Sequence, residues 1–347
     1  MRTYLAAIFA AVVSAALALP ACGADYGKLS GKKLVVGTMA RSLGLPVRQA
    51  EKAGYFKDAG LTVETVIFAT GAPINEAMAA EELDVAVSGM ASIYALATNR
   101  YTYIGDGCIT IEGQAVYARP DSPVTKHKGV AEGTLGSVDT VRGAAILGPL
   151  ATSAHYLAIK YVESFGLTAD DFDMVSMEYP QAYQAFVTGQ GDLIATVPPF
   201  SNQLDERGYT RVCDLWEVTG SPLVDTIFVQ NDVRKEREND LLAFLDCYYR
   251  ASADLRNDKD LRRKVAKEWY AEEGITYSDE DMDTEIRQQT YHTLDTMLTP
   301  EYPFGLSMTG IGAFFVTQGM IDEDNAPFIA SSLDKSLVER VKAANGK

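Results

Sequence analysis

The chain has 347 residues, of which 47% are hydrophobic, and its 31 Lys and Arg stand against 47 Asp and Glu, giving a formal net charge of -16 at pH 7. This length exceeds the size at which one hydrophobic core stops growing, so we expect two lobes. The acidic composition is not interrupted by any run of Lys or Arg, which argues against nucleic acid as a partner.

Residues 1–24 have the layout of a secretory signal peptide. Arg2 supplies a positive charge, residues 5–19 form an uncharged apolar stretch, and small residues follow. The apolar stretch is shorter than the roughly 20 residues that a membrane-spanning helix needs. The segment LPACG around Cys22 resembles the lipobox of bacterial lipoproteins, in which a lipid is attached to the Cys. We therefore expect an extracytoplasmic protein that is anchored to a membrane by a lipid on Cys22, whereas cleavage after Ala24 would give a plain secreted protein.

Three further cysteines, Cys108, Cys213 and Cys247, lie in the body of the chain. Two of them could form a disulfide in an oxidising compartment, while the simpler interpretation is three buried small hydrophobic residues. The sequence contains no CxxC pair and no Cys/His spacing typical of a metal site, so we expect no bound metal.

The first half of the chain alternates short apolar runs with stretches of helical length. A helix that begins near Pro46 can end at Gly54 in a left-handed cap. Helices are also expected at 71–82 and 91–98. The predicted strands are 34–37, 62–68, 84–88 and 101–105.

The second half repeats this plan. Gly60 and Asp84 are 24 positions apart, and Gly166 and Asp192 are 26 positions apart. The predicted strands are 144–147, 173–178, 192–196 and 210–213, with helices at 153–165, 180–188 and 199–207. Such alternation indicates right-handed βαβ crossovers and mostly parallel sheets, one in each half.

Two extended connectors, 114–119 and 225–230, join the halves, and two crossings are what a lobe inserted into another lobe requires. Residues beyond Asp232 read as helices at 238–256 and 258–272, followed by a helix with a capping box formed by Ser278 and Asp281. This tail should pack on the first lobe. The predicted domains are therefore a first lobe of residues 33–117 plus 226–347 and an inserted second lobe of residues 118–225.

Loops at the carboxyl ends of strands converge on one crevice in an open α/β sheet, so these loops are the candidates for ligand contact. In this chain most of their residues are small, hydroxylic, Gly or Pro. The candidate ligand-binding residues are Arg41, Ser42, Thr70, Gly71, Ala72, Ser88, Gly89 and Met90 in the first half and Leu150, Ala151, Thr152, Ser153, Tyr179, Gln181, Thr196 and Pro198 in the second.

Two of these loops run directly into helices, which leaves the backbone N–H groups of residues 72–74, apart from Pro73, which has none, and of residues 151–154 without partners inside the helix. Free donors at the positive end of a helix dipole suit an anion. The alternative is that Thr70, Thr152 and Ser153 only cap their own helices. Arg41 is the one cationic side chain in these loops; it could pair with an anion or, alternatively, hydrogen-bond the neighbouring chain.

Catalytic patterns are weak. His127 lies in a polar loop, His292 on a late helix, and His155 near the predicted crevice, where a packing role suits it better than a ligand contact. The sequence lacks the nucleophile elbow, the zinc-binding H-E-x-x-H and the phosphate-binding P-loop. The acidic run 268–285 reads as a solvated helix face, not as a calcium loop. We expect neither catalysis nor a cofactor.

The chain resembles the solute-binding proteins of ABC importers, specifically the sulfonate/nitrate/taurine or NMT1-like family, over about residues 33–256. The resemblance rests on a set of short motifs. These are KLVVG at 33–37, KAGYF at 52–56, AGLTVE at 59–64 and AMAAEELDVAV at 77–87, with counterparts at 142–143, 165–167 and 186–195.

This resemblance implies a periplasmic-binding-protein type II fold: two doubly wound α/β lobes joined by a two-stranded hinge, with C-terminal helices packed on lobe one. It also implies a monomer that binds a small solute between the lobes and delivers it to the transmembrane subunits of an ABC permease. Leu150 adds apolar bulk to a loop that is usually rich in Gly and Ser, which favours an organic anion such as a sulfonate or carboxylate over nitrate. Two alternatives are an enzyme on the same fold, of the pyrimidine-precursor or menaquinone-pathway type, and a sensing lobe for a signalling partner.

Overall fold

The computed structural model describes residues 24–346. The expected signal peptide and the lipid attachment at Cys22 lie outside these residues. Among the helices of residues 24–346, none combines the length and the apolar character that crossing a membrane requires.

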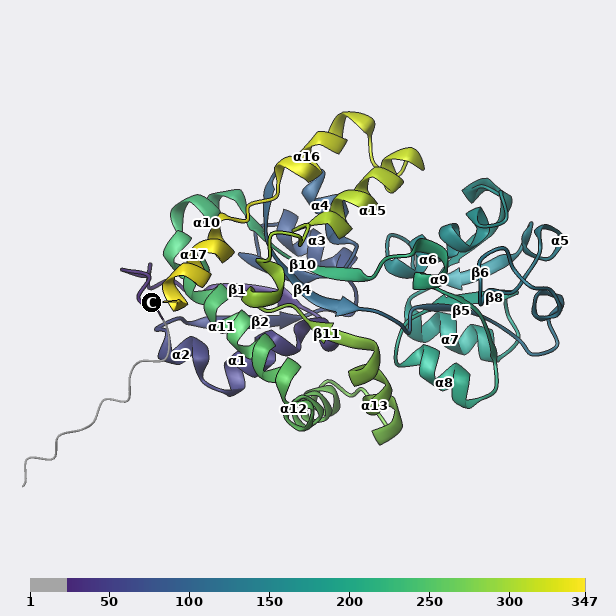
Figure 1. The fold of residues 1–347 in the computed structure, drawn as a ribbon, viewed down its shortest axis with the longest axis horizontal. Coiled ribbons are helices and arrows are strands. Elements are labelled where there is room, and N and C mark those ends of the chain that lie inside the picture. Colours follow the sequence, from purple (N-terminus) through teal and green to yellow (C-terminus); the bar gives the residue numbers. More distant parts are fainter. Residues whose placement is uncertain (1–23, 347) are drawn as a thin grey trace, which may run out of the picture.

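The chain folds into two α/β lobes, each built on its own sheet (Figure 1). The first sheet has six strands in the order β11-β4-β10-β3-β1-β2. Its strands are β1 (Leu34–Thr38), β2 (Val63–Ile67), β3 (Val85–Ser88), β4 (Tyr101–Thr110), β10 (Leu223–Gln230) and β11 (Gln289–Tyr291). The second sheet has five strands in the order β7-β6-β8-β5-β9. These are β5 (Ala115–Ala118), β6 (Ala145–Gly148), β7 (Asp173–Ser176), β8 (Leu193–Thr196) and β9 (Thr210–Asp214).

Helices cover both sheets. Those of the first lobe are α1 (Leu45–Lys52), α2 (Tyr55–Asp58), α3 (Gly71–Ala79), α4 (Ser92–Leu96), α10 (Asn231–Glu236), α11 (Glu238–Asn257), α12 (Lys259–Glu272), α13 (Asp279–Gln288), α14 (Leu294–Met297), α15 (Leu306–Thr317), α16 (Ala326–Ser331) and α17 (Ser336–Asn345). Those of the second are α5 (Val138–Val141), α6 (Ser153–Glu163), α7 (Tyr179–Val187), α8 (Phe200–Glu206) and α9 (Leu215–Thr219). Short 3-10 turns lie at Ser42–Gly44, Pro123–Lys126, Ala169–Asp171 and Glu323–Asn325.

The sheets are less parallel than the sequence predicts. Parallel pairing joins β1 to β2 and β3, and β6 to β7 and β8. The strands at the lobe junction run antiparallel: β10 to β3 and β4 in the first sheet, and β5 to β8 and β9 in the second. The prediction of mostly parallel sheets missed these antiparallel strands because it considered only the strands that belong to βαβ units.

Two further expectations were wrong. The segment 114–119 is not merely a connector, because Ala115–Ala118 forms β5 in the second sheet. The tail is not wholly helical, because β11 pairs with β4 at the edge of the first sheet. The chain thus changes sheets between Thr110 and Ala115 and returns between Asp214 and Leu223, while the expected lobe limits themselves stay a prediction.

Helix α11 of the C-terminal tail packs on the first lobe, as expected. Its residues Leu241, Phe244, Leu245 and Tyr248 are fully buried. Phe244 stacks on Phe56 of α2 with ring centroids 5.7 Å apart. Burial of such side chains contributes about 1.5–3 kcal/mol each.

Helix ends follow the sequence signals. Gly54 has a φ of 78°, the left-handed conformation that favours glycine, between α1 and α2. The capping box at Ser278 and Asp281 forms as predicted, with the Asp281 N–H donating to Ser278 Oγ at 3.0 Å. Cys108, Cys213 and Cys247 are buried and unpaired, which confirms the simpler of the two interpretations.

The lobes also touch away from the hinge. Tyr156 and Lys160 of α6 contact Phe314 of α15: the ring centroids of Tyr156 and Phe314 lie 4.9 Å apart, and Lys160 Nζ lies 3.9 Å from the Phe314 centroid. Gln318 Nε2 donates to Glu163 Oε1 at 2.8 Å. We call these residues the α6–α15 contact; it joins the second lobe to a C-terminal helix of the first (Figure 1).

Candidate functional site: the cleft between the lobes

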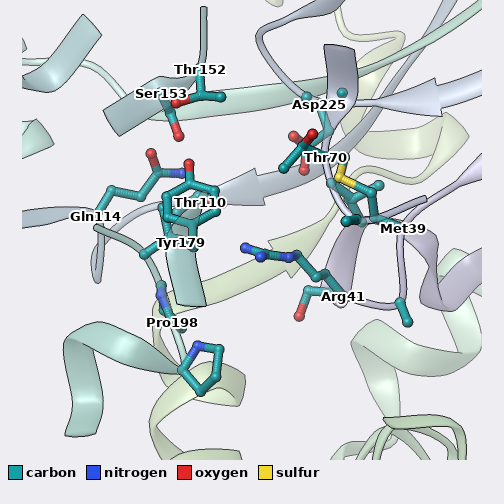
Figure 2. Close-up of a pocket in the computed structure, with 18 of the residues that line it drawn as sticks. Met39, Arg41, Thr70, Thr110, Gln114, Thr152, Ser153, Tyr179, Pro198 and Asp225 are labelled. Carbon is teal, nitrogen blue, oxygen red and sulfur yellow. The ribbon is translucent and has the colours of Figure 1, made fainter. Parts of the chain in front are cut away.

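A cavity of about 580 Å³ lies between the lobes at the carboxyl ends of their parallel strands. Most of the predicted ligand-binding residues line it. They are Arg41, Ser42, Thr70, Gly71, Gly89, Met90, Thr152, Ser153, Tyr179, Gln181 and Pro198. Figure 2 shows side chains from both lobes facing the same space. The volume suits a small organic molecule.

The other predicted residues do not line this cavity. Ser88 and Thr196, at the ends of β3 and β8, are fully buried, and their hydroxyl oxygens have no hydrogen-bond partner within the described residues. Ala72 and Leu150 are exposed, and Ala151 is held at a φ of 57° beside Leu150. Their part in ligand binding stays a prediction.

The cavity has walls that sequence reasoning did not find. The hinge contributes Thr110 and Gln114, and β10 contributes Asp225 (Figure 2). The C-terminal segment adds Tyr270, Tyr277, Glu285, Gln289 and Met308. One signal was available in the sequence, since Asp225 is the only charged residue in the apolar strand LVDTIFVQ. The tail residues carried no comparable signal.

Arg41 reaches across the cleft. It follows β1 in the first lobe, and its guanidinium carbon lies 5.0 Å from the centroid of the Tyr179 ring in the second lobe. This is cation–π geometry. Among the described residues that line the cavity, Arg41 is the only Arg or Lys. No described carboxylate forms an ion pair with Arg41, whose guanidinium contacts the Tyr179 ring, so an anion in the cleft could meet Arg41 without displacing a carboxylate.

Two helices begin at the cavity without side-chain caps. The N-cap residues Thr70 of α3 and Thr152 of α6 accept no hydrogen bond from the first turn of their helices. Thr152 Oγ1 instead donates to the carbonyl of Pro149 at 2.8 Å. Thr70 and Thr152 therefore do not cap their own helices, which was the alternative to ligand binding. The first N–H groups of α3 and α6 retain their capacity to bind an anion.

A polar network holds the loop after Arg41. Ser42 Oγ donates to Glu285, and Tyr270 also donates to Glu285 Oε1 at 3.0 Å. Arg262 donates to Ser42 Oγ at 3.2 Å and to the carbonyl of Gln289 at 2.8 Å. Ser42 lines the cavity, but its hydroxyl is engaged with the tail. The network therefore positions the Arg41 loop on the C-terminal helices.

Asp225 differs from the other acids of the cleft. Glu285 Oε1 accepts hydrogen bonds from Ser42 and Tyr270, whereas Glu178 and Glu273 are exposed at the rim. Asp225 is half-buried, and no described residue forms a hydrogen bond or ion pair with its carboxyl. Burial raises the pKa of this carboxyl to about 8.

The described residues that line the cavity include neither His nor Cys. His155 is buried behind it, where burial lowers the ring's pKa and Ala151 N donates to Nδ1 at 3.4 Å. Burial also lowers the pKa of His292 to about 4, and Tyr302 is hydrogen-bonded to its Nε2 at 2.8 Å. Within residues 24–346, no three His, Cys, Asp or Glu side chains are grouped so as to hold a metal.

Two α/β lobes with a cavity at their junction and a two-stranded crossing define the periplasmic-binding-protein fold of type II. The chain belongs to the NMT1-like family, whose model matches residues 27–269, more than half of the sequence.

The chain is also similar to individual proteins in sequence or in fold. A Brachyspira hyodysenteriae protein named "Putative ABC transporter periplasmic binding protein" is 26% identical over 344 residues, which cover 97% of this chain and 99% of that protein. The alkanesulfonate-binding protein SsuA of Xanthomonas axonopodis pv. citri, solved with bound MOPS, shares the fold with a TM-score of 0.67 and 15% identity, covering 88% of this chain and 98% of SsuA. The desulfurization enzyme DSZB shares it with a TM-score of 0.64 and 12% identity, covering 90% and 99%.

Proposed function

We propose that this protein is the extracytoplasmic solute-binding component of an ABC importer and that its solute is a small organic anion, such as a sulfonate or a carboxylate. The observation that carries the proposal is the cavity itself, which takes its lining from both lobes and contains Arg41 as its one cation among the described lining residues. Membership of the NMT1-like family and the name of the Brachyspira relative support the transport role.

The anion is supported by three donors that converge on the cavity. Arg41 approaches from the first lobe, and the uncapped helices α3 and α6 present backbone N–H groups from the first and second lobes. A charge-assisted hydrogen bond contributes about 1.5–3 kcal/mol. Tyr179, Pro198 and Met90 add apolar surface that inorganic nitrate would not use. The SsuA structure holds a sulfonate on the same fold, which agrees with this class of solute.

Binding and lobe closure are coupled in this proposal. A solute that touches Arg41 on one lobe and the Thr152–Ser153 loop on the other binds the closed form better than the open form. Moving an equilibrium from mostly open to mostly closed requires about 5.5 kcal/mol of differential affinity. The closed form then docks on the permease, and no chemical step is needed. We further propose that the mature protein is a monomer that a lipid on Cys22 holds at a membrane.

The second candidate is an enzyme, because DSZB shares the fold. The cavity lining speaks against it: none of its described residues is a Cys or a His, and the cysteines at 108, 213 and 247 are buried elsewhere. A binding role therefore fits the lining better. Chemical conversion of a bound solute, detected by mass spectrometry after incubation, would overturn this conclusion.

A thermal-shift screen of sulfonates, carboxylates, pyrimidines and aromatic acids tests the proposal. A ligand at about 100 times its dissociation constant adds about 2.7 kcal/mol to the stability of the folded protein. We expect organic anions to raise the melting temperature of the wild type but to act weakly on Arg41→Ala. Arg287→Ala is the matched control, since Arg287 is exposed on α13 away from the cavity. If only neutral heterocycles raise the melting temperature, the proposal that the solute is an anion is refuted.

A further inference from the structure

Arg41 meets the second lobe through one aromatic ring. Its guanidinium carbon lies 5.0 Å from the centroid of the Tyr179 ring, and no described residue forms an ion pair or a side-chain hydrogen bond with it. Figure 2 shows the guanidinium extending toward this ring. The cation that the proposed anion needs therefore has its one described partner in the other lobe.

The Tyr179 ring is held in place by its own lobe. Tyr179 is the first residue of α7 and is followed by Pro180, whose ring fixes the backbone of the first turn. Only 6% of Tyr179 is exposed. Arg41 has no such support, since it is half-buried on the loop after β1, and a long Arg side chain samples many rotamers when nothing holds it. A fixed ring thus orders a cation that would otherwise be mobile.

The acids near Arg41 do not take the place of the ring. Glu285 Oε1 accepts hydrogen bonds from Ser42 and Tyr270. Glu178, the residue before Tyr179, is exposed at the rim of the cleft. Among the described residues neither acid forms an ion pair with Arg41, so the orientation of the guanidinium depends on the ring.

Stacking on Tyr179 leaves Arg41 able to bind an anion. The aromatic ring covers one face of the planar guanidinium, whereas the five N–H donors lie in the plane and point outward from its edge. Two of these donors can form parallel hydrogen bonds with a sulfonate or a carboxylate when the plane is correctly turned. The ring and the solute therefore use different parts of Arg41, and a ring that fixes the plane favours the paired contact.

We propose that Tyr179 is a positioning residue for anion recognition: its ring orients the Arg41 guanidinium toward the anionic group of the solute. Because the ring belongs to the second lobe, the oriented cation exists only when the lobes are closed. The closed form thereby has a stronger anion site than the open form, which is the differential affinity that closure requires. This inference rests on the proposed function and deepens it, since it names the residue that links the anion to closure.

A double-mutant cycle tests this link. Isothermal titration calorimetry uses the mature chain with straight-chain sulfonates and carboxylates of two to six carbons, with benzenesulfonate and with benzoate. The probe with the highest affinity is then measured on the wild type, Tyr179→Leu, Arg41→Ala and the double variant. Tyr179→Phe keeps the ring and is the matched control. Tyr179→Met is a second variant without a ring, and it replaces Tyr179→Leu if that protein shows no cooperative thermal unfolding.

A cation–π contact predicts that Tyr179→Leu weakens binding by about 3- to 10-fold, whereas Tyr179→Phe stays within about 2-fold of the wild type. In the Arg41→Ala background we expect the same replacement to weaken binding by at most about 2-fold, because only the apolar surface of the ring is then lost.

The inference is overturned, and the proposed function survives, if both ring-free variants bind as the wild type does or if Tyr179→Phe loses as much affinity as they do. It is also overturned if the loss is equal with and without Arg41, because Tyr179 would then act on the solute directly. If Arg41→Ala binds the probe as tightly as the wild type does, Arg41 is not the partner of the anion, and the inference fails with it. If the wild type binds none of the probes, the proposed anion and this inference both fail.

Discussion

Replacing Asp225 by Asn should stabilise the unliganded protein, by an amount that grows with pH. Burial raises the pKa of this carboxyl to about 8 in the folded protein, whereas an Asp in an unfolded chain titrates near pH ~3.9. The stability that belongs to the neutral carboxyl is therefore fully present below about pH 4 and is lost as the pH rises to about 8. Asn cannot ionise, so the variant does not suffer this loss.

The magnitude follows from the two pKa values. Each pH unit between them costs the wild type about 1.4 kcal/mol, so the gap between wild type and variant can widen by up to about 4 kcal/mol from about pH 5 to about pH 8. Water in the cleft reaches part of the half-buried side chain, and this screening reduces the expected change to about 2 kcal/mol. Cys108 and Tyr248, the ionisable groups that face Asp225, stay neutral over this range and add nothing to the difference.

Urea denaturation of both proteins at several pH values, without solute, measures the effect. The free energy of unfolding of Asp225→Asn minus that of the wild type should rise between about pH 5 and about pH 8 and level off above that. A fixed cost from the hydrogen bonds of the Asn amide would shift the whole curve without changing its slope. A difference that is constant or falls with pH would refute a buried, unpaired carboxyl. The control Asp121→Asn, which changes an exposed Asp outside the cavity, should show no such trend.

The remaining predictions concern the cleft wall, the anion, the thiols and the lobe contact. Arg41→Ala should weaken binding of the best organic anion by about 10- to 100-fold in calorimetry, while Arg287→Ala leaves it unchanged. Gly71→Ala should destabilise the protein by about 1–3 kcal/mol in urea, because the new Cβ would lie 2.7 Å from the Ala91 Cβ; an unchanged midpoint would mean that this approach is not tight. Cys108, Cys213 and Cys247 should resist an aromatic disulfide reagent until the protein unfolds, since all three are buried and burial raises the pKa of Cys247 to about 12. Phe314→Ala should make the unliganded protein more open in small-angle X-ray scattering, and an unchanged radius of gyration would contradict that.

The loops around the cavity could be predicted because their position follows from strand order along the chain. Thr70–Gly71 and Thr152–Ser153 come directly after strands and directly before helices, so a local pattern locates them. The same rule could not separate Gly89, which lines the cavity, from its neighbour Ser88, whose side chain is buried behind it. Successive residues at a strand end point to opposite faces, and the face depends on the sheet's neighbours.

Asp225 and the tail residues escaped prediction for a different reason. β10 lies between β3 and β4, so a strand from residues 223–230 reaches the cleft beside strands more than a hundred positions earlier. Glu285 and Tyr270 also reach the cleft through contacts between residues far apart in the sequence, namely the hydrogen-bond network around Ser42. Periodicity and turn signals are local and carry no information about such pairings. The antiparallel placement of β5 was missed for the same reason.

The α6–α15 contact favours the closed arrangement of the lobes, and this contribution does not depend on a bound solute. The contact between the rings of Tyr156 and Phe314 and the Gln318–Glu163 hydrogen bond join the lobes outside the residues that line the cavity. We therefore expect that an empty protein can also close and then dock on the permease proposed as its partner. It would occupy docking sites without delivering cargo and so act as a competitor of its own loaded form. In the proposed transport role, a stronger contact would therefore lower the amount of protein at which adding more of it slows uptake.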